Sequence, residues 1–190
     1  MSILLDQPAF RGRVHRVSLE HYHRMGELGL VNEKHELIYG YILDKMSESP
    51  NHEWISQTLM MMLIKAVADT LTVRPERPLS IGDSEPEPDI SVVKGKASDW
   101  RNSHPTTAEL VIEVAITSLD LDLEKANLYA AAGVPEYWIV RPADEEIDIF
   151  REPIAGRYGK KETVRGNDEI QCSSIASFTL VPAKLFAGEA

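Results

Sequence analysis

Two carboxylates occupy unusual places in apolar segments of the sequence. Glu113 lies inside the run Leu-Val-Ile-Glu-Val-Ala at 110–115, where both alternating sets of residues are apolar. Both faces of such a strand are expected to be buried, and an isolated carboxylate there is costly unless a cation or donors compensate it. Asp89 follows Pro88 at the start of the apolar segment 88–93. If the two strands are neighbours, both carboxylates can approach one point at a sheet edge, where hard oxygen ligands suit Mg²⁺.

Each carboxylate also has a simpler interpretation. Asp89 can be a turn residue that begins a strand. Glu113 can be one half of a structural ion pair with a lysine or an arginine. The sequence alone leaves these alternatives open.

A cation near the two carboxylates would complete a site that cleaves phosphodiesters. Lys125 lies in a predicted helix at 121–132, on the same face as Tyr129 four residues later. A helix that turns back on its sheet brings its first turns near the end of the preceding strand, so the flexible lysine stem can return the ammonium to the carboxylates. A helical lysine taken alone more often faces solvent.

Two further residues are candidates for the same site. Glu36 begins a predicted hairpin and could be another metal ligand or a general base. His52 lies near the start of a predicted long helix and could stand close by, although a capping or surface histidine is the simpler interpretation.

The elements that would position these residues alternate between helical and strand periods. Ser18 and the pair Ser49–Pro50 are typical helix starts, and Gly133 is a typical helix end. The predicted helices cover 19–29, 50–70 and 121–132. The predicted strands form a hairpin around Gly40 at 36–46 and then cover 88–93, 109–115, 137–140, 147–151 and 158–164. This order predicts an α/β (α+β) fold with a mixed sheet flanked by helices, in a single domain over residues 1–190.

Composition excludes several classes of protein. The 190 residues include 30 acidic and 20 basic side chains, a formal charge of -10 that argues against a general nucleic-acid coating protein but not against a nuclease. No apolar run approaches a membrane span, and Cys172 is the only cysteine, so cysteine-based zinc sites and disulfides within the chain are excluded. We expect a cytoplasmic protein. The basic clusters, among them Arg74 with Arg77, are each most simply solvated faces.

Spacing excludes other familiar chemistries. His21 and His23 are two apart on a predicted helix and point to opposite sides. His52-Glu53 begins like a zinc-protease helix, but Ser56 stands where the second histidine is required. The sequence also lacks a phosphate loop, a dinucleotide-binding glycine motif and a serine-hydrolase elbow.

Taken together, the motifs resemble those of the Uma-two family of predicted endonucleases, in the PD-(D/E)XK, restriction-endonuclease-like superfamily. The resemblance runs from about residue 18 to residue 152. It rests on the following segments, in this order: Glu36-Leu37-Ile38-x-Gly40, His52, Pro88-Asp89-Ile90-Ser91-Val92-Val93, Glu113-Val114-Ala115 with Thr117-Ser118, Asp122-x-x-Lys125 with Tyr129, and Gly133-Val134-Pro135-Glu136-Tyr137-Trp138-Ile139-Val140.

This resemblance implies an αβββαβ core and a divalent cation, Mg²⁺ with Mn²⁺ as a possible substitute, held by Asp89, Glu113 and the Val114 carbonyl. Glu36 would complete the metal shell through water. The superfamily lysine expected two residues after the strand carboxylate is Ala115 here. The resemblance places its substitute at Lys125, which would orient the attacking water or stabilise the transition state.

The function implied is metal-dependent phosphodiester hydrolysis, with DNA as the substrate and a homodimer as the assembly, both by resemblance alone. Two alternatives remain: a catalytically inactive binding or assembly module that keeps the nuclease fold, and a phosphoesterase that acts on a small molecule.

Overall fold

The computed structural model describes residues 13–45 and 49–189, which fall into two compact units. Of the described residues, the first unit holds 13–45 together with Gly82–Glu85, and the second holds 49–81 and 86–189. No helix in the described ranges is both long and apolar enough to cross a membrane.

The first unit is built from one helix and one hairpin. Helix α2 (Leu19–Glu27) begins after Ser18, whose hydroxyl accepts the His21 N–H as an N-cap. Strands β1 (His35–Ile38) and β2 (Tyr41–Asp44) pair antiparallel across a two-residue turn. Both turn residues, Tyr39 and Gly40, have positive φ, as a tight hairpin of this kind requires. The predicted helix and hairpin are therefore confirmed, except that Met46 lies outside the described residues.

The second unit contains a six-stranded sheet in the order β3-β4-β5-β6-β7-β8. All neighbours pair antiparallel except β5 and β6, which are parallel and joined by a helix. The strands are β3 (Leu71–Pro75), β4 (Ile90–Lys94), β5 (Leu110–Val114), β6 (Glu136–Arg141), β7 (Glu146–Ile154) and β8 (Arg157–Arg165). A short 3₁₀ helix, η2 (Ala97–Trp100), lies between β4 and β5.

Helices α3 (Pro50–Ala66) and α4 (Leu119–Ala131) complete the order α3-β3-β4-β5-α4-β6. This order is the expected αβββαβ core, so the predicted fold class is confirmed. Helix α3 ends earlier than the predicted Thr70, because Val67 adopts an extended backbone and Leu71 begins β3 after a turn.

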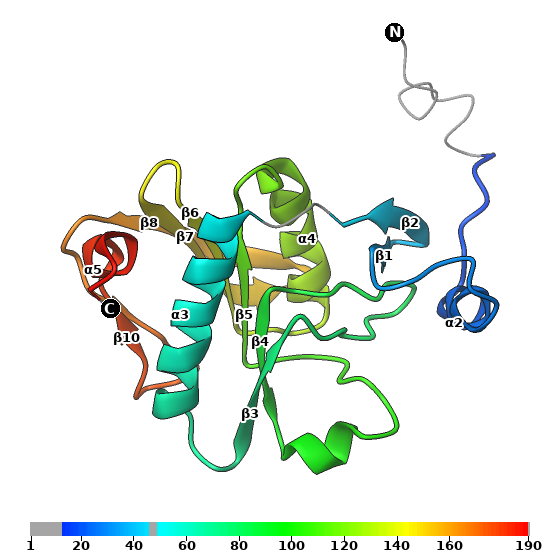
Figure 1. The fold of residues 1–190 in the computed structure, drawn as a ribbon, viewed down its shortest axis with the longest axis horizontal. Helices are drawn as coiled ribbons and strands as arrows, with labels where there is room; N and C mark the ends of the chain where they lie inside the picture. Colours follow the sequence, from blue (N-terminus) through cyan, green and yellow to red (C-terminus); the bar gives the residue numbers. More distant parts are fainter. Residues whose placement is uncertain (1–12, 46–48, 190) are drawn as a thin grey trace, which may run out of the picture. The chain divides into compact units, whose positions relative to one another are not determined.

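The two helices cover opposite faces of the sheet (Figure 1). On β6, Trp138 belongs to the apolar core with Leu59 of α3, while its neighbour Tyr137 packs against Tyr129 of α4 with ring centroids 4.9 Å apart. Successive residues of a strand point to opposite faces. Residues that share a face with Tyr137 therefore look towards α4, and those that share a face with Trp138 look towards α3.

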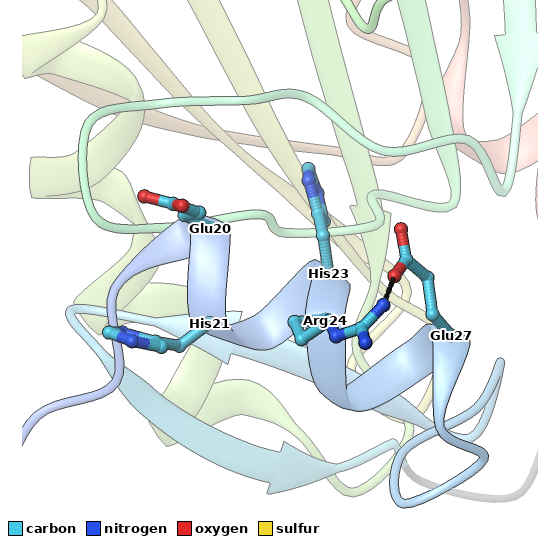
Figure 2. Close-up of a pocket in the computed structure, with 5 residues that line it drawn as sticks. All are labelled: Glu20, His21, His23, Arg24 and Glu27. Carbon is cyan, nitrogen blue, oxygen red and sulfur yellow. Dashed lines mark hydrogen bonds and ion pairs between the residues drawn. The ribbon is translucent and has the colours of Figure 1, made fainter.

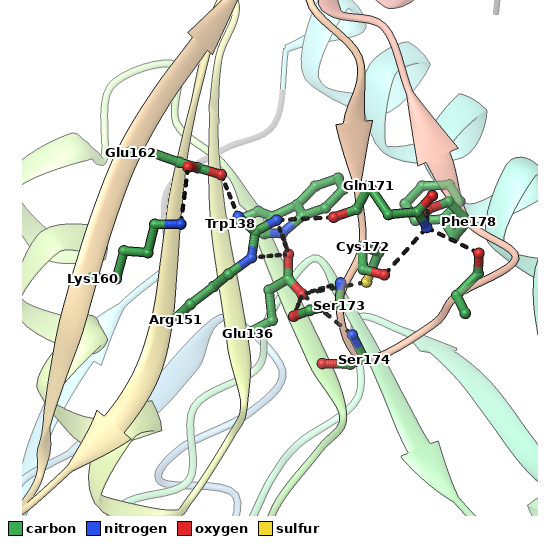
Figure 3. Close-up of polar contacts among 11 residues, drawn as sticks. Glu136, Trp138, Arg151, Lys160, Glu162, Gln171, Cys172, Ser173, Ser174 and Phe178 are labelled. Carbon is green, nitrogen blue, oxygen red and sulfur yellow. Dashed lines mark hydrogen bonds and ion pairs between the residues drawn. The ribbon is translucent and has the colours of Figure 1, made fainter.

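The C-terminal segment, which the sequence did not predict, consists of β9 (Ile170–Gln171), β10 (Thr179–Leu180) and α5 (Pro182–Ala187). The buried carboxylate of Glu136 on β6 binds the first part of this C-terminal segment to the sheet (Figure 3). One oxygen of Glu136 accepts the backbone N–H of Ser173 at 2.7 Å, and the other lies 2.8 Å from Arg151. Burial alone would raise the pKa of Glu136, but hydrogen bonds from Ser173, Trp138 and Arg151 hold it below its ordinary value.

Candidate active site

Asp89 and Glu113 meet where β4 and β5 run side by side. These strands pair antiparallel with Ile90 opposite Ile112, so the residue before β4 lies next to the end of β5. The Asp89 N–H donates to Glu113 Oε2 at 3.1 Å, and the Val114 N–H donates to Asp89 Oδ2 at 2.6 Å. Each carboxylate therefore accepts a backbone N–H from the other strand. The prediction that the two strands are neighbours is confirmed.

Helix α4 brings two more side chains to Glu113. Lys125 Nζ lies 3.2 Å from Glu113 Oε1, and the Tyr129 hydroxyl donates to the same oxygen at 3.0 Å. The side chains of Lys125 and Glu113 are only 6% and 5% exposed, so this is a buried ion pair. The contact fits both a catalytic lysine and the simpler structural ion pair, and the role of Lys125 stays a prediction.

The first turn of α4 is held by polar contacts of Asp122. Its side chain accepts the Ser118 hydroxyl at 2.5 Å and lies 4.0 Å from Lys125 Nζ, and its backbone carbonyl accepts the Tyr137 hydroxyl at 3.0 Å. Burial, followed by the charges of Glu113 and Asp122, raises the pKa of the Tyr137 hydroxyl well above its ordinary value. Tyr137 thus stays a neutral donor that fixes α4 against the sheet.

His52 reaches the same place from α3. The Ser49 hydroxyl caps this helix by accepting the His52 N–H at 3.3 Å, and His52 Nε2 lies 3.1 Å from Asp89 Oδ2. The imidazole is therefore in a position to orient the Asp89 carboxylate, in line with the expectation that His52 stands close by.

Glu36 lies on β1 in the first compact unit and is 3% exposed. The other candidates belong to the second unit, and the part assigned to Glu36 stays a prediction.

The chemistry of the donor set fits a hard divalent cation. Asp89 has a 16% exposed side chain, and in the described chain its Oδ1 makes no hydrogen bond. The Val114 carbonyl points to the same side of its strand as the Val114 N–H, which faces Asp89. Groups of three or more potential His, Cys, Asp or Glu ligands are absent from the described residues. Two carboxylates and a carbonyl agree with Mg²⁺, which keeps several waters and takes one or two carboxylates.

The sequence analysis assigned no individual role to two residues that contact the site. Tyr129 binds Glu113 and Asp122 approaches Lys125. Their spacing could have indicated this, because Asp122, Lys125 and Tyr129 follow one another at i, i+3 and i+7 on one helix face.

A surface hollow of about 510 Å³ lies on α2, in the first unit (Figure 2). Among the residues that line it, Arg24 pairs with Glu27, and His23 lies 2.9 Å from Glu85. His21 and His23 point to different sides of the helix, as their spacing predicts.

Comparisons with known proteins agree with this architecture. A family model described as "Uma2: Putative restriction endonuclease" matches residues 19–183. Among solved structures, the chain is similar to one described as "a putative nuclease" from Anabaena variabilis, with a TM-score of 0.74 and 18% identity. That match covers 92% of this chain and 99% of the other. No curated protein matches the sequence.

Proposed function

Because the chain belongs to the Uma2 family, whose model is described as "Putative restriction endonuclease", we propose that it is a metal-dependent nuclease that hydrolyses phosphodiester bonds of DNA. The observation that supports this most is the convergence of Asp89, Glu113 and Lys125 at the β4–β5 junction. Two carboxylates and one ammonium are the groups that such a hydrolysis needs in one place.

In this proposal, Asp89, Glu113 and the Val114 carbonyl hold Mg²⁺ or Mn²⁺. When bound, the cation supplies Lewis-acid activation of the phosphate and of water. Lys125 orients the attacking water or stabilises the charge that develops on the phosphate. Tyr129 fixes the Glu113 carboxylate through its hydroxyl, and His52 fixes Asp89.

The remaining parts of the proposal do not follow from geometry: the substrate, the assembly and the role of Glu36 rest on the family resemblance, and the location rests on composition. DNA is proposed as the substrate, a homodimer as the assembly and the cytoplasm as the location. Glu36 is proposed to complete the metal shell through water.

Nicking of supercoiled DNA tests the proposal. The purified protein is expected to nick DNA with Mg²⁺ or Mn²⁺, to lose this activity in EDTA, and to lose about a hundredfold or more in Asp89→Asn. A matched control is Asp148→Asn, because Asp148 is a buried carboxylate of the same sheet that pairs instead with Arg141 and Lys161. Activity that survives in Asp89→Asn, or is lost equally in Asp148→Asn, contradicts the proposal.

A second candidate function is a binding or assembly module that keeps the fold without catalysis. The buried Lys125–Glu113 ion pair favours it, since such a pair also satisfies a structural role. Intact DNA across a range of divalent metals, with no metal bound, would support this module over the nuclease.

A further inference from the structure

Arg74 is a buried arginine on the sheet face that carries Glu113. On β3, Arg74 lies opposite Ser91 of β4, which lies opposite Val111 of β5. Glu113 is two residues beyond Val111 and therefore shares this face. Val73, the neighbour of Arg74, points the other way and packs into the core beneath α3. Arg74 is 9% exposed, although the sequence indicated a solvated charge.

The contacts of Arg74 leave much of its guanidinium unused. Nη2 donates to the Pro78 carbonyl at 3.3 Å and lies 3.5 Å from His104 Nδ1. Nε is buried and makes no hydrogen bond within the described ranges. Among the residues that the structure describes, no carboxylate lies within ion-pair distance of Arg74.

The other arginines of the sheet with little exposure behave differently. Arg141 pairs with Asp144, Glu146 and Asp148. Arg151 pairs with Glu136 and Glu162. Buried arginines are almost always paired in this way, so the lack of an acidic partner at Arg74 is a local exception in a chain of formal charge -10.

A second arginine, Arg77, lies close to Arg74 in the sequence and adds another positive charge. Burial, and then the charge of the exposed Arg77, lower the pKa of Arg74. Arg74 and Arg77 thus stand three positions apart at one end of β3, with Glu76 between them, and the half-buried His104 lies beside Arg74. The register places this end beside the start of β4, because Pro75 pairs with Ile90 and the Glu76 N–H donates to the Asp89 carbonyl at 3.1 Å.

We infer that Arg74, Arg77 and His104 form an oxyanion subsite that binds a backbone phosphate of the nucleic acid, next to the phosphate that the proposed metal site at Asp89 and Glu113 would bind. A guanidinium offers planar paired donors that match phosphate oxygens. Contacts to neighbouring phosphates fix the register of a nucleic acid on a protein without reading its bases. The identification of the phosphate as part of a nucleic acid rests on the proposed function, whereas the affinity for an oxyanion does not.

Binding measured in EDTA separates this subsite from catalysis. The affinity of a DNA duplex of about two helical turns is measured between about 50 and 200 mM salt for the parent, Arg74→Gln, Arg77→Gln and Arg165→Gln. Arg165, on the opposite edge strand β8, is the control, because its side chain is 77% exposed and pairs with Glu146 of β7. Both subsite variants are expected to weaken binding about fivefold or more and to reduce the salt slope by about 1. Arg165→Gln is expected to change neither the DNA affinity nor the salt slope by a comparable amount.

Thermal melts with inorganic phosphate in the millimolar range, again in EDTA, test the affinity for an oxyanion without DNA. Phosphate is expected to raise the melting temperature of the parent more than that of either subsite variant. Because Arg77 is exposed, Arg77→Gln tests the subsite even if Arg74→Gln does not fold.

The outcomes distinguish the claims. Parent-like DNA affinity and parent-like phosphate stabilisation in Arg77→Gln overturn the subsite. Phosphate stabilisation that depends on Arg77, with unchanged DNA affinity, overturns the assignment to nucleic acid and identifies free phosphate as the ligand. Loss of DNA affinity in both variants of a protein that never nicks DNA supports the subsite and contradicts the nuclease.

Discussion

Replacing Glu113 by Gln tests whether this carboxylate is a metal ligand or only the partner of Lys125. Removing one member of a buried ion pair costs roughly 3–5 kcal/mol. Asp122 remains 4.0 Å from Lys125, and a glutamine oxygen can still accept the Tyr129 hydroxyl, so the lower end applies. Relief of repulsion with Asp89 offsets about 1 kcal/mol of this. We therefore expect Glu113→Gln to lose about 2 kcal/mol in EDTA, or about 4–8 °C in melting temperature.

Urea unfolding followed by tryptophan fluorescence is a suitable assay, because all three tryptophans lie in the second compact unit. A double-mutant cycle with Lys125→Met isolates the ion pair, and its coupling is expected to be about 2 kcal/mol. The matched control cycle, Asp148→Asn with Lys161→Met, involves a lysine that is 46% exposed and is expected to give less than about 1 kcal/mol.

Magnesium separates the two roles. At a hundred times its dissociation constant, Mg²⁺ stabilises a protein that binds it only when folded by about 2.7 kcal/mol. The parent is expected to gain this and Glu113→Gln to gain almost none. Equal stabilisation of both proteins would refute the assignment of Glu113 as a ligand, and a parent indifferent to metal would favour the non-catalytic module.

The remaining predictions concern the lysine, the C-terminal anchor, the α3 cap and DNA binding. Lys125→Ala should reduce kcat of nicking about a hundredfold with little change in metal affinity, as measured by steady-state kinetics and Mn²⁺ titration. Glu136→Gln should cost about 3 kcal/mol at neutral pH because it leaves Arg151 without its buried partner. Since the folded pKa of Glu136 is lowered from 4.5, this difference should be complete above pH 4.5 and shrink as the pH falls through the lower folded value, as urea unfolding across pH would show. Ser49→Ala should cost about 1 kcal/mol by removing the N-cap of the helix that carries His52. DNA affinity of the parent should fall steeply with salt, and a flat salt dependence in an anisotropy titration would indicate a different partner.

Local signals in the sequence predicted most of the fold. The Ser49–Pro50 start of α3 and the hairpin around Gly40 are set by backbone preferences of single residues, which do not depend on distant parts of the chain. Strand β3 was not predicted, because its five residues contain Arg74 and end in Pro75. Its stability comes from pairing with β4, which composition does not encode.

The candidate site was predictable only in part. Glu113 attracted attention because a carboxylate in an apolar strand is costly, and this argument needs only local sequence. The contact between His52 and Asp89 joins residues 37 positions apart, and it depends on how α3 packs on the sheet. The burial of Arg74 likewise depends on the fold around β3 and was missed, since its type and neighbours indicate a surface charge.

A crystal structure of the protein grown with Mn²⁺ tests the central claim most directly. The account predicts an anomalous peak within coordination distance of the Asp89 and Glu113 carboxylates, with the Val114 carbonyl turned towards it and Lys125 beside it. The account would be contradicted if, at a saturating concentration of Mn²⁺, no Mn²⁺ were bound at either carboxylate and Glu113 were still paired with Lys125.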